Sequence, residues 1–269
     1  MVRFFATIAL LSAALQAVAA PGPSQGTYRV LLTGFGPFEG FPVNPAWLAV
    51  QPLQNMVIDL GAGNASQAAP GRRSVHISAL QIPVTYDGVL SIVPGLHARP
   101  PVLPRPVGPN FPPPPPEGYD LAFHVGVWPK GGPMRMEHLG HKLGYWAPDA
   151  EGKYAPTVRT SQGEDRGFVG PRYQRFPSEM NTDIDVRSLV QSLKQSGIQQ
   201  IQESWDPERY LCDFIYYCSL AESARNALPM RKKTLVQFLH IPPINQPLAT
   251  KDVTEAIKRS IVWIARNTN

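Results

Sequence analysis

Short apolar runs alternate with segments of helical periodicity along most of the chain. Compact or alternating apolar stretches predict strands, whereas apolar positions at i, i+3, i+4 and i+7 predict helices. We expect strands at Tyr28–Phe35, Ser74–Val84, Leu121–Val127, Gln199–Ser204 and Thr234–Ile241. We expect helices at Asn44–Val57, Tyr86–Leu96, Asp183–Gly197, Leu211–Asn226 and Val253–Arg266. This alternation predicts one α/β domain with a mainly parallel sheet that is covered on both faces.

The first twenty residues do not fit this alternation. One cation, Arg3, precedes an apolar run, and the small residues Ala17–Ala20 follow that run. This order is typical of a secretory signal peptide, and we expect residues 1–19 to be removed. An uncleaved hydrophobic tail or a signal anchor is the alternative. The glycosylation sequon at Asn64 agrees with secretion.

Composition changes this picture in one place. The chain has 269 residues with 30 prolines, 2 cysteines and a formal net charge of +5. Ten of the prolines lie in Pro100–Pro116, which we expect to be an exposed loop inserted into a domain spanning residues 27–269, because proline disrupts helices and sheet ladders. A polyproline ligand is the alternative to a plain surface insertion. Two cysteines exclude a disulfide scaffold, and the mild, scattered charge does not favour nucleic acid as a partner.

Cys212 lies between a predicted strand and the first turn of a predicted helix. Helix-terminal N–H groups favour a thiolate and stabilise an oxyanion, so this position predicts a nucleophile with a lowered pKa, suited to acyl transfer. Cys218 shares an apolar helical face with Leu211 and Phe214 and is expected to be a buried core thiol. A helix would separate the two cysteines by about 9 Å, beyond the reach of a disulfide.

His240 ends a predicted strand, because Pro242-Pro243 follows it directly. Ligands gather at the carboxyl ends of strands in α/β sheets, which makes His240 the best-placed base for Cys212. His138 and His141 frame the segment EHLGH, which lacks the order of a zinc motif, and we expect neither a metal site nor a cofactor. The other histidines are His76 and His124, in predicted strands, and His97, in a predicted loop.

Four segments resemble, in family order, the motifs of type I pyroglutamyl peptidases, the cysteine peptidases that remove N-terminal pyroglutamate from peptides. The segments are Val30–Trp47 (VLLTGFGPFEGFPVNPAW), Met136–Tyr145 (MEHLGHKLGY), Arg209–Ala221 (RYLCDFIYYCSLA) and Phe238–Pro243 (FLHIPP). The resemblance extends from about Tyr28 to the C-terminus. It implies a single three-layer α/β/α domain with a mainly parallel, mixed central sheet, in agreement with the alternation of elements.

The resemblance implies a catalytic triad of Glu137, Cys212 and His240. Cys212 would attack the carbonyl of the pyroglutamyl amide, His240 would take and return the proton, and Glu137 would orient the imidazole. The expected partners are peptides with an N-terminal pyroglutamate. Neither nucleic acid nor a metal is expected as a partner, and no stable membrane association is expected after signal cleavage.

The family's substrate pocket is apolar and aromatic and accepts a flat, neutral lactam. The residues that the resemblance assigns to this pocket are Phe35, Phe38, Asn44, Tyr210 and Leu211. Structural alternatives stay open, because Phe35 and Phe38 could be core residues and Asn44 a helix cap.

Several features depart from the family pattern. Pro207 and Glu208 stand where the family has Ala-Gly, and Val127–Gly132 replaces a loop of small residues. A side chain in place of glycine restricts the backbone, and Pro207 removes a donor close to the expected oxyanion hole. A weakened homologue that binds pyroglutamyl peptides without turnover, or a related cysteine amidase, is therefore the alternative function. The signal-like leader also departs from a family that is mostly cytosolic, so a cytoplasmic location is the alternative to secretion.

Overall fold

A computed structural model describes residues 26–38, 40–61, 74–105, 107, 111–161, 163–227 and 232–268. The predicted signal peptide and the sequon at Asn64 lie outside these residues, as do four positions of the proline-rich insertion. Among the described residues, no helix is long and apolar enough to cross a membrane.

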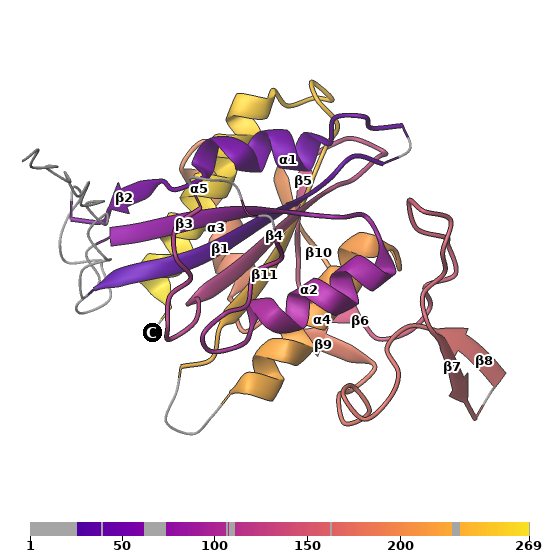
Figure 1. The fold of residues 1–269 in the computed structure, drawn as a ribbon. Coiled ribbons are helices and arrows are strands. Elements are labelled where there is room, and N and C mark those ends of the chain that lie inside the picture. Colours follow the sequence, from indigo (N-terminus) through magenta and orange to yellow (C-terminus); the bar gives the residue numbers. More distant parts are fainter. Residues whose placement is uncertain are drawn as a thin grey trace, which may run out of the picture.

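A seven-stranded sheet runs through the centre of the molecule (Figure 1), in the order β10-β5-β11-β4-β1-β3-β2. The strands are β1 (Thr27–Phe35), β2 (Val57–Asp59), β3 (Ser74–Ile82), β4 (Leu121–Val127), β5 (Met134–Glu137), β10 (Ile201–Ser204) and β11 (Leu235–Ile241). The four central strands β3, β1, β4 and β11 are parallel, while β2 and β5 pair antiparallel with their neighbours β3 and β11. The predicted sheet, mixed and mainly parallel, is confirmed.

Helices cover both faces of this sheet (Figure 1). One face packs against α1 (Pro45–Val50), α3 (Val186–Gln195) and α5 (Thr250–Asn267), and the other against α2 (Tyr86–Leu96) and α4 (Leu211–Asn226). Strand β1 shows how one strand supplies both cores: Val30 and Leu32 pack in the first and Leu31 in the second, because successive side chains alternate between faces. The three-layer α/β/α architecture is thus confirmed.

Two small antiparallel pairs extend from the main body. Strand β6 (Leu139–His141) pairs with β9 (Glu179–Asn181), and β7 (Thr157–Thr160) pairs with β8 (Gly163–Arg166). The pair β6–β9 lies beside α4, whereas the β7–β8 hairpin projects away from the sheet (Figure 1). Strand β6 matters for the site because it continues directly from β5.

The helix predicted over Asn44–Val57 is wrong beyond Val50. Helix α1 ends there, a short 3-10 turn η1 (Gln51–Leu53) follows, and β2 begins at Val57. Pro52 lies in the turn and lacks the N–H that a continuing α-helix requires. His97 lies in a turn directly after α2, in agreement with the predicted loop, where it caps the C-terminus of the helix and is buried.

Candidate active site

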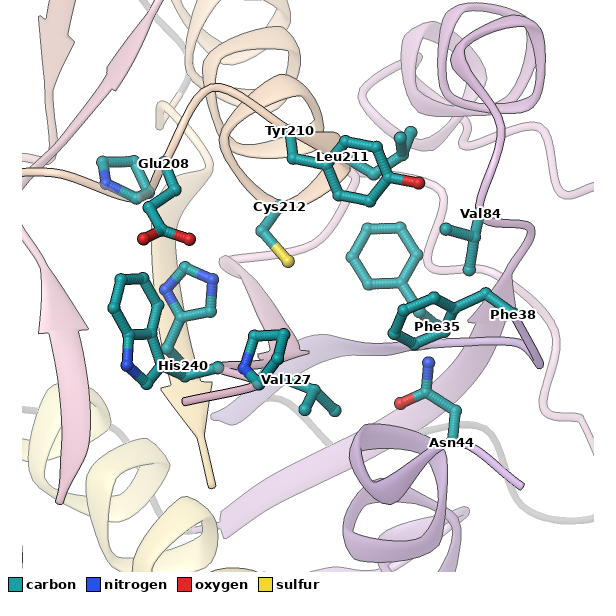
Figure 2. Close-up of a pocket in the computed structure, with 13 residues that line it drawn as sticks. Phe35, Phe38, Asn44, Val84, Val127, Glu208, Tyr210, Leu211, Cys212 and His240 are labelled. Atoms are coloured by element: carbon teal, nitrogen blue, oxygen red, sulfur yellow. The ribbon is translucent and has the colours of Figure 1, made fainter. Parts of the chain in front are cut away.

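Three segments that are distant in the sequence meet at the carboxyl ends of β4 and β11. Gly126 on β4 is the register partner of His240 on β11, and Cys212 is the second residue of α4 above them. A methyl group added at Gly126 would lie 2.5 Å from Cys212 Sγ, so the thiol rests directly against the glycine backbone. Since register partners point to the same face of a sheet, the imidazole of His240 and the thiol of Cys212 share one pocket (Figure 2).

Glu137 reaches this pocket through strand β5. The antiparallel pairing of β5 with β11 places Glu137 opposite Phe238, two residues before His240 on the same face. The alternation of the strand sends Met134 and Met136 into the opposite core. Glu137 Oε1 lies 2.8 Å from His240 Nδ1, and both side chains are almost completely buried. The three residues predicted as a triad are therefore brought together, with the carboxylate paired to the imidazole.

Neighbouring side chains hold this pair in place. The Tyr216 hydroxyl and the Gln237 amide donate to the backbone carbonyl of Glu137, at 3.1 and 2.8 Å. The Trp128 ring meets the His240 ring edge to face, with centroids 5.5 Å apart. These contacts fix the position of the carboxylate and the plane of the imidazole.

Burial raises the pKa of the Cys212 thiol, and the carboxylates of Glu137, Asp213 and Glu208 add to that effect. The lowered pKa that we expected from the helix terminus is therefore not found in this arrangement, where desolvation and nearby carboxylates both disfavour the thiolate. Helix α4 also begins without a side-chain cap at Tyr210.

The pocket in front of Cys212 is mostly apolar. All five residues that the sequence assigned to a substrate pocket lie on its wall. Sequence reasoning did not assign the remaining wall residues, which are Val84, Val127, Trp128, Pro129, Pro207 and Glu208. Trp128 and Pro129 directly follow the carboxyl end of β4, and that position was the available signal for them.

Asn44 performs the structural task that was its alternative role. Its Oδ1 accepts from the Ala46 backbone N–H at 2.9 Å, and its Nδ2 donates to the Gly36 carbonyl at 2.8 Å. The side chain therefore caps α1 and ties it to the end of β1. It also lies on the pocket wall, where its role towards substrate stays a prediction.

The remaining cysteine and histidine motifs lie outside the pocket. Cys218 is buried in the core, with its sulfur 3.4 Å from the Tyr173 hydroxyl, and both cysteines are free. His138 pairs with Glu203 at 2.9 Å, while His141 pairs with Asp213 at 2.8 Å. Within the described ranges, no group of three histidine, cysteine or acidic side chains is arranged to hold a metal ion.

Comparison with known proteins gives this site a context. The chain is 27% identical to pyroglutamyl-peptidase 1 of Homo sapiens over 234 residues, which cover 86% of this chain and 87% of the human protein. It is also 27% identical to the pyrrolidone-carboxylate peptidase of Bacillus velezensis over 248 residues, which cover 88% of this chain and 92% of that protein. This chain is a homologue of the type I pyroglutamyl peptidases. The resemblance that the four motifs indicated is confirmed, although no protein-family profile matches the chain.

Solved structures of pyroglutamyl peptidases share the fold. The crystal structure of pyroglutamyl peptidase I from Bacillus amyloliquefaciens superposes with a TM-score of 0.62 at 22% identity, covering 88% of this chain and 95% of that chain. A mutant pyrrolidone carboxyl peptidase from Pyrococcus furiosus gives a TM-score of 0.62 at 21% identity, covering 88% and 97%. These likenesses support the three-layer architecture.

The segment before Cys212, which departs from the family motif, has a backbone conformation typical of glycine at Glu208. Glu208, which replaces the usual glycine, has φ of 60°. A residue with a Cβ pays about 1–2 kcal/mol in that left-handed region. The Glu208 amide donates to Asp206 Oδ1 at 3.1 Å, and its carboxylate lies 2.7 Å from Lys130 Nζ. These two contacts hold the strained residue in the conformation that glycine adopts freely.

Proposed function

We propose that this protein is a cysteine peptidase that removes N-terminal pyroglutamate from peptides. The observation that carries the proposal is the 2.8 Å pair between Glu137 and His240, at the edge of an apolar pocket that also contains the Cys212 thiol. The homology with pyroglutamyl peptidases over most of the chain supports the substrate class.

The reaction starts with the pyroglutamyl ring in the aromatic part of the pocket. His240 takes the proton of the Cys212 thiol as the sulfur attacks the carbonyl carbon that joins pyroglutamate to the next residue. Glu137 stabilises the imidazolium that forms. Backbone N–H groups at the start of α4 donate to the developing oxyanion.

The attack gives a tetrahedral intermediate, and the reaction then proceeds in two stages, formation of a thioester and its hydrolysis. The C–N bond breaks, His240 returns its proton to the leaving amine, and pyroglutamate remains on Cys212 as a thioester. A water molecule, deprotonated by His240, attacks the thioester carbon, the C–S bond breaks, and the thiolate regains a proton from the imidazolium. The raised pKa of the Cys212 thiol agrees with a base that acts during the attack.

A fluorogenic pyroglutamyl amide tests this proposal. The purified protein is expected to release the fluorophore, and Cys212→Ala is expected to abolish release while keeping the thermal unfolding midpoint. Prolyl and free glutamyl amides in the same assay test the alternative that the protein is a related cysteine amidase with another substrate. Release by the Cys212→Ala variant would overturn the mechanism.

The alternative of a weakened homologue depends on Pro207 and Glu208. The φ of 60° at Glu208 favours an active site, because it lies in the left-handed region that a glycine at this position would adopt freely. If the two side chains nevertheless disable the oxyanion hole, the double variant Pro207→Ala/Glu208→Gly will gain activity. An unchanged rate would remove that explanation for low activity.

Secretion is part of the same proposal, because the leader has the order of a signal peptide. Expression of the full chain in a eukaryotic host, with N-terminal sequencing of the protein from the medium, tests it. A mature N-terminus at Ala20 is expected. Retention of the full-length chain inside the cell would favour the cytoplasmic alternative.

A further inference from the structure

Lys130 and Glu208 form an ion pair between the two loops that approach the pocket. Lys130 lies in the loop after β4 and Glu208 in the loop before α4, with Nζ and Oε1 2.7 Å apart. Both residues belong to segments that depart from the family motifs. The pair lies next to the catalytic groups, since Glu208 shares the pocket wall with Cys212 and His240.

Figure 2 shows that the pocket has two sides. Phe35, Phe38 and Val84 lie on one side of Cys212, while Glu208 and His240 lie on the other. The flat pyroglutamyl ring fits the aromatic side. The leaving amine must then lie near His240, which protonates it, so the residue after pyroglutamate extends along the side of Glu208.

Charge on this leaving-group side is arranged asymmetrically. Glu208 lies on the pocket wall, with its carboxylate on the His240 side of Cys212 (Figure 2), whereas Lys130 is not a wall residue. Arg135 stacks on Trp128, with Cζ 3.9 Å from the ring centroid, and donates to Ser204 Oγ at 3.0 Å. It also lies 3.9 Å from Glu137, which compensates its charge. The side chain that a substrate meets is therefore the Glu208 carboxylate.

Lys130 is a displaceable partner for this carboxylate. Its side chain is 71% exposed, against 41% for Glu208. An exposed lysine that loses its partner returns to water with little loss, because exposed pairs are weak. A substrate cation can replace it, and the face of Trp128, which already contacts two cations, adds a cation–π surface nearby.

We propose that Glu208 is a specificity-determining residue that favours a basic residue directly after pyroglutamate. An arginine or lysine side chain at that position displaces Lys130 and pairs with the Glu208 carboxylate. An acidic residue at the same position meets this carboxylate and is disfavoured. This inference rests on the proposed function, because it takes the substrate to be a pyroglutamyl peptide.

The test compares two peptides that differ only in the second residue, pyroglutamyl-Arg and pyroglutamyl-Glu peptides with the same remainder. At low ionic strength, kcat/KM is expected to be up to about five-fold higher for the arginyl peptide, as for an exposed ion pair. Glu208→Gln should bring the ratio close to one, Lys130→Ala should increase it, and high salt should reduce it.

Glu255→Gln is the matched control. Glu255 on α5 is 43% exposed and pairs with Arg259 at 2.8 Å, so this substitution removes the same charge from a carboxylate of similar exposure outside the pocket. Its ratio should equal that of the wild type. A wild-type ratio of one or below, or a ratio that Glu208→Gln leaves unchanged, would overturn the proposal.

Binding to the Cys212→Ala variant separates this inference from the proposed function. Calorimetry with the same two peptides should show tighter binding of the arginyl peptide, and adding Glu208→Gln should remove the difference. If the wild type cleaves neither peptide but this binding difference persists, the inference stands and the proposed catalysis fails. If both peptides are cleaved equally, the catalysis stands and the inference fails. Neither cleavage nor binding would overturn both.

Discussion

Glu137 Oε1 lies 2.8 Å from His240 Nδ1, although the two residues are 103 positions apart in the chain. The other carboxylate oxygen, Oε2, is buried and has no hydrogen-bond partner among the described residues. The nearest cation outside this pair is Arg135, 3.9 Å from Oε1. An acid placed in this way holds the proton of the imidazole on Nδ1 and leaves Nε2 to act as the base.

Glu137→Gln tests this relationship with little change in shape. The amide keeps the volume of the buried acid but removes the charge that stabilises the imidazolium, so kcat is expected to fall by about 10²- to 10⁴-fold. Steady-state kinetics with a pyroglutamyl amide measures the loss, and thermal unfolding checks that the fold persists. Activity within about three-fold of the wild type in a folded variant would show that the acid has no catalytic role.

Gly126→Ala is expected to displace the nucleophile. The added methyl group would lie 2.5 Å from Cys212 Sγ and 2.8 Å from Phe238 Cζ. A shift of about 1 Å at a reacting atom can reduce the rate by about 10²-fold, and overpacking costs about 1–3 kcal/mol of stability. Gly36→Ala is the matched control, because there the nearest atom is 3.6 Å away. Equal activity of the two variants would contradict the close approach of the thiol to β4.

Alkylation of Cys212 should report its raised pKa. Burial and three nearby carboxylates disfavour the thiolate, so the rate of inactivation by iodoacetamide should keep rising as the pH increases through the alkaline range. A preformed thiolate–imidazolium pair would instead give a rate that levels off below neutral pH. The Cys218 thiol is buried and should not react in the folded protein, and mass spectrometry of the alkylated peptide checks this.

Two buried histidines should make the fold sensitive to acid. Ser219 Oγ lies 2.7 Å from His97 Nε2 and 2.8 Å from His124 Nε2, and burial lowers the pKa of each imidazole to about 3. Their pKa in the unfolded chain is about 6.5, so the unfolded state takes up protons first as the pH falls. The stabilisation is complete above about pH 6.5 and is lost between that value and about pH 3.

Urea unfolding at pH 7 and pH 5 measures this loss. At about 1.4 kcal/mol per pH unit and histidine, the free energy of unfolding should fall by roughly 4 kcal/mol between these values. His97→Gln should reduce the slope by about half, whereas His76→Gln should reduce it less, because His76 on β3 is only partly buried. A slope that His97→Gln leaves unchanged would assign the acid sensitivity to other groups.

Local patterns in the sequence determined the main elements. Helix α4 has the bounds that the pattern predicts, Leu211–Asn226, and β4 is likewise found at Leu121–Val127. The same patterns placed Cys212 in the first turn of a helix and His240 near the end of a strand. Hydrophobic periodicity and the ending of elements at proline depend only on residues close together in the chain, so a single sequence is enough to predict these elements.

The sequence offered little basis for predicting strand β5. Its four residues, Met134–Glu137, are too short for a periodic signal, yet their alternation directs Glu137 to the catalytic face and the methionines to the opposite core. Only the family resemblance singled out this acid among the others. The pairing of β5 with β11 brings together segments about one hundred residues apart, which no local pattern encodes.

The sequence by itself determined the fold class, the helix that presents Cys212 and the strand that presents His240. The tertiary structure alone decided that Glu137 contacts His240, that burial raises the pKa of the Cys212 thiol, and that Lys130 pairs with Glu208 beside the pocket. The first group depends on residues close in the chain. The second depends on strand pairing and on removal from water, and these arise only when distant segments pack together.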